Sequence, residues 1–398
     1  MTKPSFLLVI FLFSMPSCFL DSKTGMERRI ERANNGDVAA QFNLGIFYAN
    51  GQGVPQDKVE SAKWYRMAAN QGDMQAQFNL GVLYANGEGV SQDYAEAIKW
   101  YVLAAEQNYA LAQNNLGHMY SNGIGVEENH DEAIKWYRMA AEQGDATAQL
   151  NLGNRFGTKA QNHIEGAKWY RLAADQGLPK AQHNLAVYYA EGTAFPQDYT
   201  EAAAWYVRAA TQGHAGSQNN LGKLYSRGNG VPQDYEEAAK WYRLAADQGA
   251  AGSQSNLGTL YRDGKGVPQD HEEAVKWFRR SAEQGFPQAQ NNLGMAYHMG
   301  SGVSQDVEKA VKWYRLAAAQ GDFYAQHNLG ICHEEGKGAP QKNEVAFMWF
   351  EIAFTSGNEI SLQKRNTLAE KMTGEQIAEG QRLATEWREK FNAPDQSR

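Results

Sequence analysis

Apolar and small residues recur along most of this chain with a regular period. In residues 73–105, a first apolar stripe follows i, i+4 and i+8 spacing through Ala76, Leu80 and Tyr84. A second stripe comprises Ala97, Trp100, Tyr101 and Ala104. Both spacings place apolar side chains on one face of an α-helix. We therefore predict two amphipathic helices in each period.

Polar residues and glycines mark the ends of these helices. Asp73 precedes the first stripe as an N-cap, while Gly87 and Gly89 follow it, as expected at a helix C-terminus. Asp93 and Glu96 form a capping box before the second stripe. Asp or Asn occupies the Asp93 position in eight of nine units, and Lys342 occupies it in the last.

The period is 36 residues, apart from one interval of 33 residues between Leu152 and Leu185. Nine of the ten tryptophans keep the same register. The nine repeats span residues 37–357, and residues 21–36 are predicted to form an N-terminal capping half-repeat. The repeat leucines are Leu44, Leu80, Leu116, Leu152, Leu185, Leu221, Leu257, Leu293 and Leu329.

The pattern A-Q-x-N-L-G-x-x-Y-x-x-G-x-G-V-x-x-D-x-x-x-A-x-K-W-Y-x-x-A-A, complete in residues 76–105, resembles the Sel-1-like repeat, a relative of the tetratricopeptide repeat. The resemblance implies an all-α fold, an α-solenoid of helix-turn-helix repeats forming a right-handed superhelix. It also implies that the first helices line a concave groove. Local departures are Phe156, Ala186, Ala194 and His333.

Two polar or small positions in the repeat need a structural explanation. Glycine inside the first helix, as at Gly81, costs about 1 kcal/mol relative to alanine. We expect it to allow close approach of a neighbouring helix or of a tryptophan ring. The repeat asparagine, as at Asn79, is expected to bond the backbone between units rather than to contact a ligand.

The residues after the repeats lack the period. Thr373 and Gln376 form a capping box for a final helix, whose Leu383, Ala384, Trp387 and Phe391 are expected to cover the open end of the array. We predict C-terminal capping helices over residues 358–391 and a disordered tail over residues 392–398.

The first 20 residues have the pattern of a secretory signal peptide. Lys3 precedes the apolar run of residues 6–13, which is too short to span a bilayer, and small residues follow. A buried N-terminal helix is the alternative. Cys18 ends a loose match to a bacterial lipobox, so lipidation there is a second possibility. The prediction is export to the bacterial periplasm or medium, with a lipid anchor at Cys18 as a variant.

Composition excludes several classes of function. The net charge is −7, and no basic stripe suggests a nucleic-acid partner. Two cysteines cannot form a disulfide framework, and the nine histidines lack metal-ligand spacing. The G-x-G segments follow helices rather than strands, so they do not match a dinucleotide-binding loop. We predict no catalytic, cofactor or metal residues.

Candidate binding residues are those that vary between otherwise similar repeats. The variable positions lie two and five residues before the repeat leucine and two and five residues after it. This spacing places them on one face of the first helix. Phe42, Ile46, Phe78 and Val82 are expected to form an exposed apolar patch. Neutral variation on an unused surface is the alternative. The remaining candidates are Asn114, His118, His183, Asn219, Lys223, Asn291 and His327.

Two functions remain at this point. The first is a non-enzymatic scaffold that binds a protein or peptide through its concave surface. The second is a cell-wall or β-lactam-acting enzyme like the cysteine-rich branch of the family. The repeats here lack the paired cysteines of that branch, which weakens the second function.

Overall fold

A computed structural model describes residues 23–158 and 162–392, and these residues form 21 α-helices and no strand. The first helices of the repeats are α2 (Val38–Asn50), α4 (Met74–Asn86), α6 (Ala110–Asn122), α8 (Ala146–Thr158), α10 (Pro179–Glu191), α12 (Ala215–Arg227), α14 (Ala251–Asp263), α16 (Pro287–Met299) and α18 (Phe323–Glu335). The second helices are α3 (Lys58–Asn70), α5 (Tyr94–Glu106), α7 (His130–Glu142), α9 (His163–Asp175), α11 (Tyr199–Thr211), α13 (Tyr235–Asp247), α15 (His271–Glu283), α17 (Val307–Ala318) and α19 (Asn343–Thr355). Outside the repeats lie α1 (Lys23–Asn34), α20 (Glu359–Ala369) and α21 (Gly374–Asn392).

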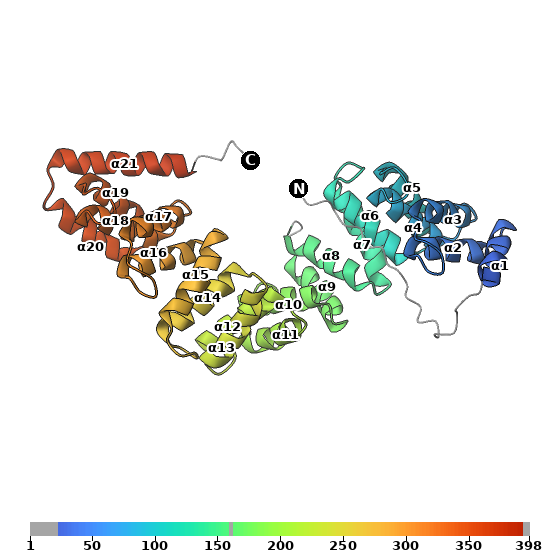
Figure 1. Cartoon of the computed structure of the whole chain (residues 1–398), viewed down its shortest axis with the longest axis horizontal. Helices are drawn as coiled ribbons and strands as arrows, with labels where there is room; N and C mark the ends of the chain where they lie inside the picture. The colour runs from blue at the N-terminus through green and yellow to red at the C-terminus, as the bar shows by residue number, and fades with distance from the viewer. Residues whose placement is uncertain (1–22, 159–161, 393–398) are drawn as a thin grey trace. The chain divides into compact units, whose positions relative to one another are not determined.

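The chain divides into two compact units, Met1–Pro196 and Gln197–Arg398. Within each unit, almost every helix packs chiefly against the helices before and after it in the sequence (Figure 1). The apolar stripes meet in these contacts, because one repeat cannot bury its own apolar face. The predicted α-solenoid of helix-turn-helix repeats is confirmed.

The helix ends follow the predicted capping residues. Asp234 Oδ1 accepts hydrogen bonds from the backbone N–H groups of Glu236 and Glu237, at 2.9 and 3.0 Å. Asp or Asn caps eight second helices in this way, whereas the Lys342 side chain makes no capping bond to α19. The sequence pattern therefore predicted both the caps and the exception.

The second loop glycine joins neighbouring repeats. Gly89 has a φ of 69°, in the left-handed region that favours glycine. A Cβ atom at Gly89 would also overlap the carbonyl oxygen of Lys58, at the start of the preceding second helix. Gly230, Gly266 and Gly302 pack in the same way. Glycine at this position lets the loop of one repeat contact the backbone of the previous repeat.

The glycine inside the first helix accommodates an aromatic ring of its own repeat. A Cβ atom at Gly81 would lie 2.7 Å from the ring of Tyr101, which follows Trp100 on α5. The expected close approach of a neighbouring helix is therefore confirmed, since Tyr101 lies on α5, whereas the alternative of a tryptophan ring was wrong. Phe278 and Phe350 take this place in two repeats, opposite Gly258 and Gly330.

A ladder of glutamine side chains runs through the repeats. The buried glutamine of the first helix donates from Nε2 to an alanine carbonyl at the end of the preceding second helix, as Gln77 does to Ala69 at 3.2 Å. Its Oε1 accepts from the glutamine that ends its own second helix, as Gln77 does from Gln107 at 2.8 Å. The second bond is also present at Gln71, Gln143, Gln176, Gln248, Gln284 and Gln320.

The helix before the repeats uses the same ladder. Gln41 Nε2 donates to the carbonyl of Ala33 on α1 at 2.8 Å, so α1 contacts α2 as a second helix contacts the next repeat. The predictions for residues 1–20 and Cys18 lie outside the described residues. The same holds for the predicted tail of residues 392–398, apart from Asn392, which ends α21.

The two C-terminal helices cover different parts of α19. The helix α20 packs where the next first helix would lie, while α21 packs along α19 (Figure 1). The predicted capping box is present, with Thr373 N donating to Gln376 Oε1 at 3.0 Å. Ala384 is 1% exposed and packs with Met348 and Ile352 of α19.

The expectation that Leu383, Ala384, Trp387 and Phe391 cover the open end was wrong in its target. They lie on α21, and Leu383, Ala384 and Trp387 pack on α19. The α20 helix covers the end instead, because it continues the alternation of first and second helices.

Candidate partner-binding surface

The apolar patch expected on the first two repeats is not an exposed surface. Phe78 is 2% exposed and Val82 is fully buried. The Phe78 ring lies 5.8 Å from that of Tyr101 and 5.4 Å from that of Tyr109. Tyr109 stands at the N-cap of α6, where aspartate precedes α2 and α4, and its ring packs against Phe78. Exposure was therefore wrongly predicted for Phe78 and Val82.

The equivalent residues of the first repeat are partly accessible. Phe42 and Ile46 are half-buried on α2, and the Phe42 ring lies 5.9 Å from the Tyr65 ring. Asp73 occupies the place that Tyr109 takes one repeat later, so no aromatic ring extends over Phe42 from that position. Of the predicted patch, the residues on α2 therefore remain partly accessible, whereas those on α4 are buried.

The variable position before the repeat leucine links successive first helices. Asn151 donates to Asn114 at 3.0 Å, and Asn328 donates to Asn291 at 2.9 Å. Asn219 accepts from Ser253 Oγ at 2.9 Å. These half-buried or buried amides hold neighbouring repeats together. Their polar atoms that are not used in these bonds lie on the same face of the first helices.

The candidate histidines are partly buried. Burial, followed by Arg155, lowers the pKa of His118, and burial, followed by Lys364, lowers the pKa of His327. Both imidazoles are consequently neutral near pH 7, each offering one donor and one acceptor. His327 Nδ1 lies 2.7 Å from Ser361 Oγ on α20, and His183 is half-buried on α10.

A cationic part of the first-helix face was largely missed in the sequence. Lys223 is exposed on α12, and partial desolvation, followed by Arg227, lowers its pKa. Arg227 is also exposed, and Arg262 on α14 donates to Asn292 at 3.4 Å. Arg262 lies five residues after its repeat leucine, at one of the variable positions, which is the signal that could have identified it.

The repeat asparagine bonds side chains rather than the backbone. Asn220 donates to the hydroxyl oxygen of Tyr206 on the preceding second helix at 3.1 Å, and Asn184 donates to Asn154 at 3.2 Å. A bond between repeats was expected at this asparagine, but with the backbone as the partner rather than a side chain.

Groups with catalytic potential are sparse in the described residues. Cys332 is fully buried, and burial raises the pKa of its thiol to about 11, so it stays protonated near pH 7. Across residues 23–158 and 162–392, no cluster of three His, Cys, Asp or Glu side chains could hold a metal ion. Among those same helices, none combines the length and the apolar character needed to cross a bilayer.

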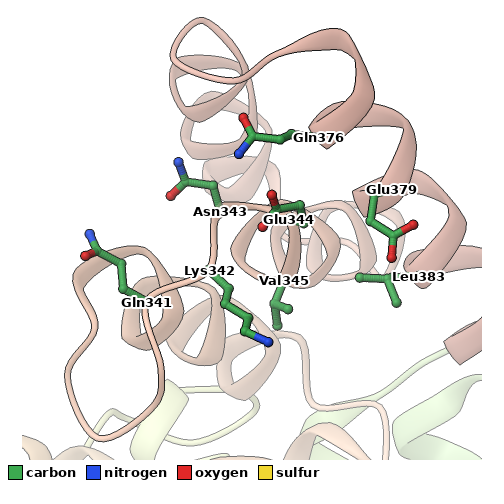
Figure 2. A pocket seen from close by; sticks show the side chains of 8 residues that line it. All are labelled: Gln341, Lys342, Asn343, Glu344, Val345, Gln376, Glu379 and Leu383. Atoms are coloured by element: carbon green, nitrogen blue, oxygen red, sulfur yellow. The ribbon is translucent and has the colours of Figure 1, made fainter.

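An open cleft of about 660 Å³ lies between the start of α19 and α21 (Figure 2). Lys342, Asn343 and Glu344 line it from the loop and first turn of α19, while Gln376 and Glu379 line it from α21. Its charges are mixed and its side chains are mostly exposed or half-buried. The cleft lacks the buried polar groups that would define a specific site.

Comparison with known proteins gives a consistent result. A family model described as Sel1 repeat matches nine segments: residues 38–73, 75–109, 110–145, 146–178, 179–214, 215–249, 251–286, 287–322 and 323–358. A crystal structure of c5321, described as a protective antigen of uropathogenic Escherichia coli with an SLR fold, is 33% identical. The match covers 92% of this chain and 87% of that one, with a TM-score of 0.60.

A Sel1 repeat protein from Oxalobacter formigenes is 32% identical, over 86% of this chain and 90% of that one, with a TM-score of 0.43. No curated protein matches the chain.

Proposed function

Because the chain belongs to the Sel1 repeat family, we propose that it is a non-enzymatic scaffold that binds a protein or peptide through its first-helix face. Sel1 repeat folds are typical of proteins that mediate protein interactions. The observation that carries the proposal is that, within each unit, the first helices carry amide, imidazole or cationic side chains at the variable positions. Amides and neutral imidazoles can donate and accept hydrogen bonds, which suits the alternating groups of a peptide backbone.

The most accessible of these side chains lie on α12. Lys223 and Arg227 are exposed there, and Asn219 lies one turn before Lys223. We propose that this cationic segment contacts acidic or polar groups of the partner, together with Asn291 and His327 of the same unit. Asn114, His118 and His183 are separate candidate contacts on the first unit. Phe42 and Ile46 would add an apolar contact at α2.

Capture experiments with matched charge reversals test the proposal. Lys223→Glu changes the first-helix face, while Lys240→Glu changes an exposed lysine of α13, which pairs with Glu237 at 2.7 Å. Each variant is crosslinked in cell-envelope extract and its captured proteins are compared by mass spectrometry. A partner captured by the wild type and by Lys240→Glu, but lost with Lys223→Glu, supports the proposal. Equal capture by both variants contradicts a role for this segment.

We further propose that the protein is exported. Lys3 and the apolar run of residues 6–13 support this proposal, and Cys18 is the position for a lipid anchor. The similar Escherichia coli protein is described as a protective antigen, a description that fits an exported protein. The sequence does not favour the enzyme alternative, since the repeats lack paired cysteines.

A further inference from the structure

The glutamine ladder is incomplete in the last repeat. Gln326 of α18 is fully buried and donates to the Ala318 carbonyl at 3.3 Å, as in every earlier repeat. Its Oε1, however, has no hydrogen-bond partner within the described residues. The reason is that Ser356 ends α19 at the position where glutamine ends the preceding second helices. A buried acceptor left unpaired costs about 1–3 kcal/mol, so this atom needs a partner.

A cavity of about 260 Å³ lies between α18, α19 and α21. Gln326 and Ser356 both line it, together with Gly321, Ile352 and Thr355. A single water needs only about 10–15 Å³ of such volume, so the space can hold more than one solvent molecule. The remaining wall comes from Trp387, Arg388 and Phe391 of α21.

The α21 helix adds a cation and an aromatic surface to this cavity. The Nε and Nη2 atoms of Arg388 are buried and have no hydrogen-bond partner in the described part of the chain. Arg388 Nη2 forms an ion pair with Glu351 Oε1 at 3.5 Å, beyond the usual length of a hydrogen bond, while Glu351 Oε2 pairs with Arg365. The Trp387 and Phe391 rings stack at 4.7 Å, and both residues line the same cavity as Arg388.

We propose that this cavity binds a carboxylate ligand that bears a primary carboxamide, namely a glutamine. Its amide N–H groups donate to Gln326 Oε1, replacing the glutamine that Ser356 lacks, and its α-carboxylate accepts from Arg388. The aliphatic part of the ligand packs against Ile352 and Trp387. The ligand is either a free glutamine derivative or the C-terminal glutamine of a peptide. This site is separate from the first-helix face and does not depend on the proposed scaffold function.

Binding is measured by calorimetry on the full chain, with N-acetyl-L-glutamine as the probe. N-acetyl-L-glutamate is the matched control ligand, because its side-chain carboxylate has the same shape but cannot donate to Gln326 Oε1. We expect saturable binding of the first and none of the second. Equal affinity for both, or no binding of the amide ligand in any form, overturns the proposal and leaves solvent as the only occupant.

A peptide ending in glutamine identifies the source of the ligand. Tighter binding of this peptide than of N-acetyl-L-glutamine indicates a partner C-terminus, whereas the reverse indicates a free amino-acid derivative. Amidation of the peptide carboxyl group removes the charge-assisted contact with Arg388, and is expected to lower affinity by roughly tenfold to a hundredfold. Binding of the amidated peptide as strongly as the free acid contradicts the role of Arg388.

Three variants distinguish an effect on ligand binding from an effect on the stability of the fold. Ser356→Gln supplies the missing side chain, and is expected to raise Tm and abolish binding. Arg388→Gln removes one charge-assisted contact, which lowers affinity by roughly tenfold to a hundredfold. Gln284→Ser creates the same gap beside Gln254 but without an arginine from α21, so this variant keeps the wild-type affinity and gains no second site. Undiminished binding by Ser356→Gln overturns the proposal.

Discussion

Ring-against-glycine packing decides which substitutions the first helices tolerate. In α14, a Cβ atom at Gly258 would lie 2.8 Å from the Phe278 ring and 3.1 Å from the Ala274 carbonyl oxygen. At Gly252, on the same helix, the nearest such atom is 3.8 Å away. The two glycines therefore share a helix but not a packing environment.

Alanine at these two positions is expected to have opposite effects. Gly258→Ala overpacks a buried contact and lowers the free energy of unfolding by about 1–3 kcal/mol. Gly252→Ala lacks that clash and raises it by up to about 1 kcal/mol through helix propensity. Urea unfolding followed by circular dichroism measures both. Equal changes in the free energy of unfolding of the two variants would show that the contact between Gly258 and the Phe278 ring does not affect stability.

Buried tyrosines make the fold sensitive to alkali. Burial raises the pKa of Tyr137 to about 12, against about 10 for an exposed phenol. Above pH 10 the unfolded chain therefore binds fewer protons than the native chain, so stability falls as pH rises. The loss from this residue is about 1 kcal/mol per pH unit between pH 10 and 12.

Tyr137→Phe should remove that contribution. Phe278 occupies the equivalent position in the seventh repeat, so the ring alone is compatible with the packing. The variant and the wild type are compared in urea midpoints at pH 8 and pH 11. We expect a smaller decline for the variant, and an identical decline would contradict ionisation of this phenol as a cause.

The sequence predicted residues of the repeat core better than residues of its variable face. The leucine recurs in nine repeats, and the glycine of the first helix and the Asp or Asn cap each recur in eight, so each instance supports the others. Burial of Phe78 depends on one local change, the replacement of an N-cap aspartate by Tyr109, whose ring packs against Phe78. Periodicity alone identified the helical face but could not predict which side chain of the next repeat contacts it.

At the scale of the elements, the position of α21 is explained by a residue change on α19, the helix against which it packs. Seven of the other repeats carry lysine just before the repeat tryptophan, as at Lys240, and one carries Ala204. The last repeat has Met348 there, and Met348 packs with Ile352 against Ala384. This single exchange of a lysine for an apolar residue is the sequence signal that α19 has a covering helix.

A charge at the centre of this contact should detach α21. Ala384→Glu places a carboxylate against Met348 and Ile352, and we expect faster proteolysis within α21 and increased binding of an apolar dye to α19. Thr385→Glu, at an exposed neighbouring position, is the matched control. If Ala384→Glu resists protease as well as the control does, α21 is not held by this contact.

For the whole molecule, export remains a prediction that one measurement can test. Intact mass of the protein purified from its natural source should show a chain that starts between residues 17 and 26. Added mass of a diacylglycerol on Cys18 would select the lipoprotein variant. A chain retaining Met1 would contradict export through a cleaved signal.

The pattern of repeats was predictable over residues 37–357 because the hydrogen bonds that define it lie within one repeat or between neighbouring repeats. Even the short fourth repeat keeps this rule: Asn162 N donates to the Phe156 carbonyl at 2.9 Å, as Asp93 N does to Tyr84 at 3.0 Å. The ends were less predictable, since α20 and Ser356 depart from the pattern and have no second instance for comparison.

The glutamine ladder also has a consequence for how such a gene can change length. Each rung joins a glutamine only to its own repeat and to the last turn of the previous one. Duplication or loss of one full period between equivalent codons therefore leaves every hydrogen bond of the ladder paired as before. A partial duplication would bring two unmatched glutamines into the interior. Unequal recombination in this lineage is thus expected to add or remove whole repeats, while the final one, with Ser356, is inherited as a fixed terminus.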